Sequence, residues 1–183
     1  MTRSPHDPAG RQHQLQPGAA AAPLLPADTH FHIQEMRDKK IDIDGFLGSL
    51  SFGIDIGLEA NDAEERAGII GRFPRLYMSV GMYPGEVENP DWRKELETLA
   101  SAARLPRVIA VGETGLDLHW KYGTLSGQIE LFEAQIDLAD QAGLPVIVHT
   151  RNADAETIEV LSRTRPRRGG IIHCFSSGIE TRS

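Results

Sequence analysis

The chain has 183 residues, of which 40% are hydrophobic, and 19 basic against 26 acidic side chains give a formal net charge of −7 at pH 7. This balance argues against nucleic-acid binding through overall basicity, although divalent cations at a metal site would offset much of the acidic charge. No apolar run approaches the roughly 20 residues of a membrane-spanning helix, and the single cysteine, Cys174, cannot form an internal disulfide. We therefore expect a soluble protein of the reducing cytoplasm that does not bind a membrane.

The first 25 residues contain four prolines, a run of four alanines and little that could pack against a core. We expect residues 1–25 to be a disordered tail and residues 26–183 to form the folded domain. The apolar stretch before residue 27 is short and is interrupted by Pro23 and Pro26. It is therefore not expected to be a secretion signal.

Short apolar runs after residue 26 are typical of β-strands, and they alternate with helix-like segments. The predicted strands are 27–32, 51–57, 75–81, 107–113, 144–149 and 170–175. Strands that alternate with helices imply a parallel sheet.

Two of the connecting helices carry signals at their ends. The first is expected to be capped by Asn89, with Pro90 at its first helical position. The second is expected to run from about Ser126 to a stop at Gly143. One face of this second helix would carry Ile129, Phe132, Ile136 and Ala139.

Side chains that bind metals well stand at the ends of four predicted strands. His30 and His32 end the first strand and share one of its faces, because strand side chains alternate. Glu113 ends the fourth strand, His149 the fifth and His173 the sixth. Active sites of eight-stranded α/β barrels lie at the carboxyl ends of the strands, whereas a doubly wound sheet concentrates its site at one switch point. We therefore predict an α/β fold of the TIM-type (β/α)8 barrel, with about six βα units present.

Each of these side chains also has a structural interpretation. A single histidine is more often a hydrogen-bonded structural residue than a ligand, but four at the expected strand ends reverse that expectation. For Glu113 the alternative is a buried acid paired with an arginine or lysine.

Two further residues near the strand ends are considered for binding. Arg151, just beyond His149, is expected on the rim of the site, where a guanidinium suits phosphate. Its alternative is an exposed arginine paired with Asp154 or Glu156. His119 would face either the substrate or solvent.

Two residues near the predicted ligands are not expected to bind a metal or the substrate themselves. Asp117 could orient a ligand imidazole from behind. Cys174 is expected to be a small inward-facing residue beside His173, because nothing nearby in the sequence would activate its thiol.

Four ordered motifs resemble a known family. The segments are DTHFHI at 28–33, AVGETGLD at 110–117, PVIVHTRNA at 145–153 and GIIHCFSSG at 170–178. In order and spacing they resemble the metal-binding motifs of the TatD-related deoxyribonucleases, within the amidohydrolase-like metallohydrolase superfamily. The resemblance covers the chain from about residue 26 to its end.

The resemblance implies a cytoplasmic hydrolase that cleaves phosphodiester bonds in DNA with two divalent cations, which could be Mg, Mn or Zn. His30 and His32 would bind the first metal, and His149 and His173 the second. Glu113 would bridge both, because its two oxygens can each bind one metal, and would act in catalysis together with a metal-bound water. Arg151 and His119 would bind substrate.

Two features differ from the family pattern. Family members usually carry an Asp at the end of the eighth strand, and we expect this terminal Asp and the last two βα units to be absent, since a full barrel typically needs at least about 200 residues. The third-strand motif, usually Gly-x-His-Pro, reads Gly81-Met82-Tyr83-Pro84 here. The alternatives are a non-catalytic truncated remnant and another amidohydrolase-like enzyme, acting on a cyclic amide or an ester. In many enzymes of that second kind a modified lysine bridges the metals, and Glu113 stands at that strand end instead.

Overall fold

A computed structural model describes residues 24–175, so the predicted tail lies outside the described residues except for its last two positions. The strands are β1 Ala27–Phe31, β2 Phe52–Asp55, β3 Leu76–Val80, β4 Val108–Asp117, β5 Val146–Arg151 and β6 Gly170–His173. The helices are α1 Ile33–Asp38, α2 Ile43–Gly48, α3 Ala63–Ile70, the 3-10 helix η1 Pro84–Glu88, α4 Trp92–Ala102, α5 Leu125–Ala142 and α6 Asp154–Thr164. No helix in this part of the chain is both long enough and apolar enough to cross a membrane.

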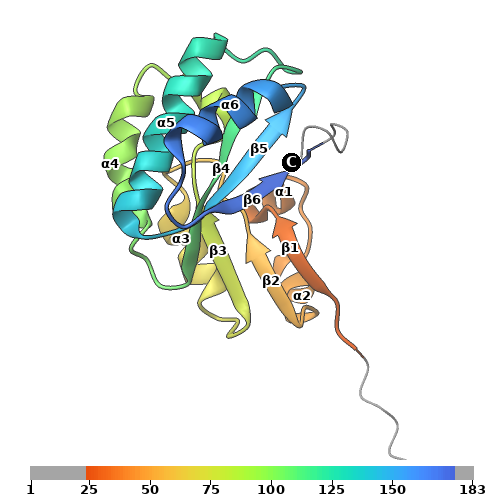
Figure 1. Ribbon diagram of the computed structural model, residues 1–183. Coiled ribbons are helices and arrows are strands. Elements are labelled where there is room, and N and C mark those ends of the chain that lie inside the picture. Colours follow the sequence, from red (N-terminus) through yellow and green to blue (C-terminus); the bar gives the residue numbers. More distant parts are fainter. Residues whose placement is uncertain (1–23, 176–183) are drawn as a thin grey trace, which may run out of the picture.

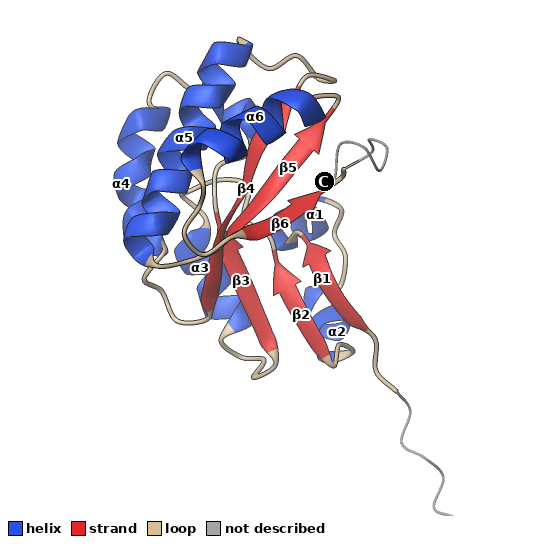
Figure 2. Cartoon of the chain, viewed as in Figure 1, coloured by secondary structure: helices blue, strands red, loops and turns tan. Residues whose placement is uncertain are grey.

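The strands form one parallel sheet in which each strand pairs with the next along the chain, in the order β1 to β6. Figure 1 shows that the sheet curves, so that β6 approaches β1, and Figure 2 shows the helices packed on its outer side. This is part of a (β/α)8 barrel, as the sequence predicted. Parallel pairing brings the carboxyl ends of the strands to one edge, where the predicted ligands stand.

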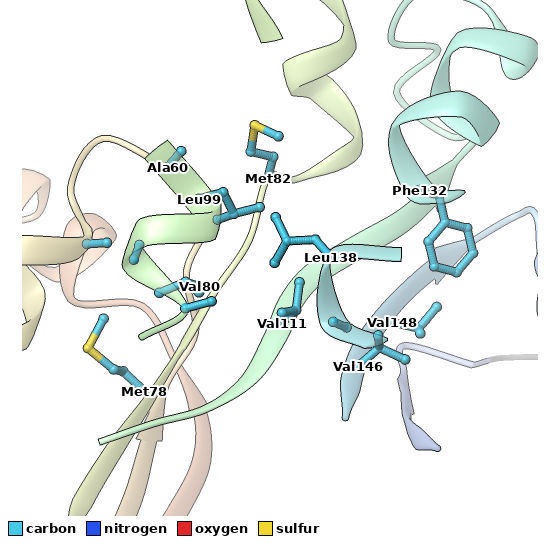
Figure 3. Packing of buried hydrophobic residues seen from close by; sticks show 14 of the residues in the cluster. Ala60, Met78, Val80, Met82, Leu99, Val111, Phe132, Leu138, Val146 and Val148 are labelled. Carbon is cyan, nitrogen blue, oxygen red and sulfur yellow. The ribbon is translucent and has the colours of Figure 1, made fainter. Parts of the chain in front are cut away.

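The main core fills the layer between the sheet and the helices. On β4 and β5, Val111, Val146 and Val148 point into it and meet Leu138 and Phe132 of α5 (Figure 3). The alternate residues point the other way, as the strand period requires. They form a second, small cluster of Ile56, Ala110 and Ile147. Both faces of the central strands are therefore apolar, as in a parallel sheet covered on both sides.

The end of α5 agrees with the prediction, and the start of α4 does not. Gly143 ends α5 in the left-handed conformation, with φ 70°. However, α4 begins at Trp92 and has Asp91 at its N-cap, so the prediction of Asn89 as cap and Pro90 as first residue is wrong. The Asn89 side chain accepts a hydrogen bond from the Asp91 amide at 3.0 Å, and this local turn delays the helix.

Cys174 does not face inward as predicted, because it is exposed. Strand β6 ends at His173, and Cys174 takes a φ of 59°, which breaks the alternation of side chains at that point. The prediction assumed that the strand would continue through residue 175.

Candidate metal centre

The end of β1 holds two imidazoles in place through the neighbouring strand. His32 lies directly before α1, and its Nδ1 is 3.0 Å from the carbonyl oxygen of Ile56. A ring nitrogen facing a carbonyl must donate, which leaves the lone pair of the neutral ring on Nε2. The next amide, that of Ile33, donates to Oδ1 of the buried Asp55 at 2.8 Å. The backbone around His32 is therefore anchored to β2.

The end of β4 can carry Glu113 deep in the sheet because two glycines near it allow β5 to approach closely. Gly112 has φ 151° and Gly115 has φ 140°, a region that disfavours other residues. A Cβ at Gly112 would collide with the Ile147 carbonyl oxygen, and one at Gly115 with that of His149. These contacts explain why glycines flank the acid on both sides.

Glu113 lies at the centre of the predicted ligands and is only 3% exposed. Its Oε2 faces β1, 3.4 Å from Nε2 of His30 and 3.9 Å from Nε2 of His32. Its Oε1 faces β5, 2.7 Å from Nδ1 of His149. The two oxygens of one carboxylate therefore point at two different sets of imidazoles. No arginine or lysine of the described residues pairs with Glu113, so the structural interpretation as a buried salt bridge does not hold.

His173 joins this group from the far end of the sheet. It is the register partner of His149 across β5 and β6. Its ring stacks on that of His30, with the centroids 3.7 Å apart. Ligand atoms of His30, Glu113 and His173 all lie within 4.8 Å of one another. The structure thus brings together all five predicted ligands, from β1, β4, β5 and β6.

The surroundings of the His149 ring fit a cation. Both of its ring nitrogens face carboxylates, Nδ1 toward Glu113 and Nε2 toward Oδ2 of Asp117 at 3.0 Å. A neutral imidazole has one N–H, so donation to Asp117 leaves a lone pair aimed at a carboxylate oxygen. A cation shared by that nitrogen and Glu113 removes the conflict. Imidazoles with a carboxylate are also a usual donor set for divalent transition metals.

The local charges shift two pKa values in the direction that metal binding needs. Burial alone would raise the pKa of Glu113, but hydrogen bonds and charge from His149 and His30 outweigh it and lower this pKa well below its usual range. Burial and the nearby His30 lower the pKa of His173. Glu113 is therefore ionised and His173 neutral near neutral pH, which are the forms that ligate.

Asp117 contacts the predicted ligand His149, as the hypothesis of an orienting residue requires, and it also accepts a hydrogen bond from Tyr83, which the sequence analysis did not place there. The Tyr83 hydroxyl donates to Oδ2 of Asp117 at 2.6 Å and lies 3.3 Å from Nε2 of His149. Burial and the Asp117 charge raise the pKa of Tyr83. In the sequence Tyr83 was noted only as a departure from a motif. The sequence signal for Tyr83 is its position just after the third strand, because the carboxyl end of that strand lies at the same edge of the sheet as the predicted ligands.

The proposed substrate-binding residues lie on the rim beside this centre. The guanidinium of Arg151 lies over the Trp120 ring, 5.3 Å from its centroid. His119 is exposed, and its ring meets the edge of Trp120 at 4.7 Å. Trp120 was not among the residues singled out from the sequence.

Comparison with known proteins is consistent with this site. The family model for TatD-related DNase matches residues 27–183. The uncharacterized metal-dependent hydrolase TatD of Mycobacterium tuberculosis is 40% identical over 111 residues, which are 56% of this chain and 40% of that protein. The 3'-5' ssDNA/RNA exonuclease TatD of Enterobacter lignolyticus is 29% identical over 133 residues, which are 72% of this chain and 50% of that protein.

A solved structure shows the same fold. The crystal structure of YjjV, a TatD homolog from Escherichia coli, superposes with a TM-score of 0.72 at 28% identity, covering 85% of this chain and 62% of that one. The chain thus spans about half the length of the curated relatives that it matches, between 40% and 50% for the two described above.

Proposed function

Because the chain belongs to the TatD-related DNase family, we propose that its carboxyl-edge site is a two-metal centre for hydrolysis of phosphodiester bonds in DNA. The observation that carries the proposal is the division of the two Glu113 oxygens, of which Oε2 faces His30 and His32 and Oε1 faces His149. Two divalent cations, when bound, acidify a water and neutralise charge on the phosphoryl oxygens.

In this proposal the residues of the site have separate roles. His30 and His32 would hold one cation, His149 and His173 would hold the other, and Glu113 would contribute to both. Asp117 accepts the Nε2 proton of His149 and so keeps that ring in the tautomer with a free lone pair on Nδ1. Burial of the site strengthens each of these interactions, because water is excluded from around Glu113.

The rim supplies contacts to the substrate. Arg151 carries a positive charge, and it lies two residues beyond His149 on β5. A guanidinium in this position suits a phosphate of the substrate, and His119 lies next to it on the neighbouring loop. Because a relative of this chain is named a single-stranded DNA and RNA exonuclease, single-stranded DNA is the first substrate to test.

The test is hydrolysis of an end-labelled single-stranded oligonucleotide in the presence of Mg²⁺ or Mn²⁺. The expected result is metal-dependent product formation that falls by about 10²-fold or more in Glu113→Gln, since this change removes the charge shared by both metals. Glu130→Gln is the matched control, because Glu130 is exposed on α5 and pairs with the surface residue Arg93. Equal rates in wild type and Glu113→Gln, or no metal-dependent hydrolysis by the wild type, would contradict the proposal.

A further inference from the structure

An exposed tryptophan stands at the carboxyl edge of the sheet, beside the proposed metal centre. Trp120 lies in the loop between β4 and α5 and is 57% exposed. The other large aromatic exposed in the described region, Phe52, lies at the amino end of β2 and has Tyr77 beside it. Burying an indole normally stabilises a fold, so an exposed one at the mouth of a site suggests a ligand.

The backbone holds this tryptophan in a fixed place relative to the proposed metal ligands. The amides of His119 and Trp120 both donate to Oδ1 of Asp117, each at 2.9 Å. The other oxygen of the same carboxylate contacts His149. The Leu118 amide donates to the Arg151 carbonyl at 3.0 Å, which ties the loop to β5. The backbone that carries Trp120 therefore needs little ordering when a ligand arrives.

The groups around the ring match the parts of one nucleotide. The indole offers a flat face to a base, and base stacking on aromatic side chains tolerates any sequence. Arg151 lies over the same ring and offers a cation to the adjoining phosphate. In a duplex the faces of the bases are covered by their neighbours, so such a platform selects unpaired bases.

From this arrangement we infer that Trp120, supported by Arg151, is a stacking platform for an unpaired base of single-stranded nucleic acid. The inference deepens the proposed function and rests on it for the identity of the substrate. Trp120 is a binding and specificity-determining residue in this account, and it takes no part in bond cleavage.

The test measures binding without cleavage, with EDTA present, by fluorescence anisotropy of a labelled single-stranded oligonucleotide. The expected result is that Trp120→Ala weakens binding about 10-fold, since stacking of one base corresponds to about 5- to 150-fold in affinity. Trp120→Phe should recover most of the affinity, because it restores an aromatic face. Phe52→Ala is the matched control, as it removes an exposed aromatic at the opposite edge of the sheet, and it should leave binding unchanged.

An oligonucleotide of the same length with abasic sites separates stacking from attraction to phosphates. Wild type and Trp120→Ala should bind it equally, because it offers no base to stack, whereas Arg151→Ala should still weaken it. An equal loss for the abasic and the normal oligonucleotide in Trp120→Ala, or no loss with either, would overturn the inference. So would equal affinity of the wild type for duplex and single strand. These outcomes are independent of hydrolysis, so intact binding with no cleavage would contradict the proposed function alone.

Discussion

Replacing Arg66 by methionine is expected to destabilise the protein strongly, because Arg66 is a charged residue inside the fold. Arg66 is only 1% exposed, and its guanidinium donates to Asp55 and Asp62, each at 2.8 Å, and to the Ser79 carbonyl at 3.1 Å. Burial opposes its charge, but the two carboxylates outweigh burial and raise the pKa of Arg66 further. Arg66 is therefore charged at neutral pH, while burial raises the pKa of its partner Asp55 despite that charge.

The distances set the magnitude of the effect. With an effective dielectric constant of about 20, charges at this separation attract by about 6 kcal/mol, part of which repays their desolvation. Methionine fills a similar volume but leaves Asp55, which is fully buried, without its cation. Breaking a buried pair in this way typically costs about 3–5 kcal/mol. For an m value of about 2 kcal/mol/M, the urea midpoint falls by about 1.5–2.5 M.

The assay is urea unfolding followed by circular dichroism, with Arg37→Met as the matched control. Arg37 pairs with Glu65 at 3.0 Å, but both side chains are largely exposed, so its loss should cost at most about 1 kcal/mol. A similar urea midpoint for Arg66→Met and Arg37→Met would refute the reasoning that burial makes the loss of the Arg66 ion pair costly.

The remaining predictions concern the site. Glu113→Gln should weaken Mn²⁺ binding at least 10-fold in calorimetric titration because it removes the shared charge, and unchanged affinity would exclude Glu113 as a ligand. Metal affinity should fall as the pH drops below about 6.5, since protons compete for the imidazoles. Because the pKa of His173 is lowered, this residue should stay neutral to a lower pH than an ordinary histidine. An affinity that is flat down to about pH 5.5 would exclude histidine ligation. Arg151→Ala should raise KM for the oligonucleotide several-fold and leave the metal content, measured by elemental analysis, unchanged. Loss of metal would show instead that Arg151 stabilises the metal centre. Cys174 should react with a thiol reagent in the native protein as fast as in urea, and protection in the native state would contradict its exposure.

The parallel sheet and the grouping of the predicted ligands could be expected from the sequence because both depend on strand ends. Apolar runs that end in His32, Glu113, His149 and His173 place these residues at one edge whatever the details of the helices. The contacts between loops could not be read in this way. Tyr83 meets Asp117 across 34 positions of the chain, and nothing in either local pattern encodes that hydrogen bond.

Local details depended on backbone conformations that sequence patterns leave open. Asn89 suits both a helix cap and a turn, and the structure uses it for the turn. A strand pattern through residue 175 is compatible with the apolar run, but the positive φ of Cys174 ends it earlier. Trp120 fits a loop as well as a core, and its exposure follows only from the anchoring of that loop on Asp117.

The order of the strands has a consequence for how the chain folds and opens. Each strand pairs with its neighbour in sequence, so the sheet can grow by adding one strand at a time, although each parallel pairing must first close a helical crossover, which slows folding. The His30 and His173 rings meet only after the last of these additions. Among the strands of residues 24–175, β6 is the most weakly covered, with Ile171 65% exposed, so it is the one of these six that should open at the lowest cost in free energy. Mild denaturant should therefore abolish the site while most of the sheet persists, and hydrogen exchange would detect β6 as the first strand to lose protection.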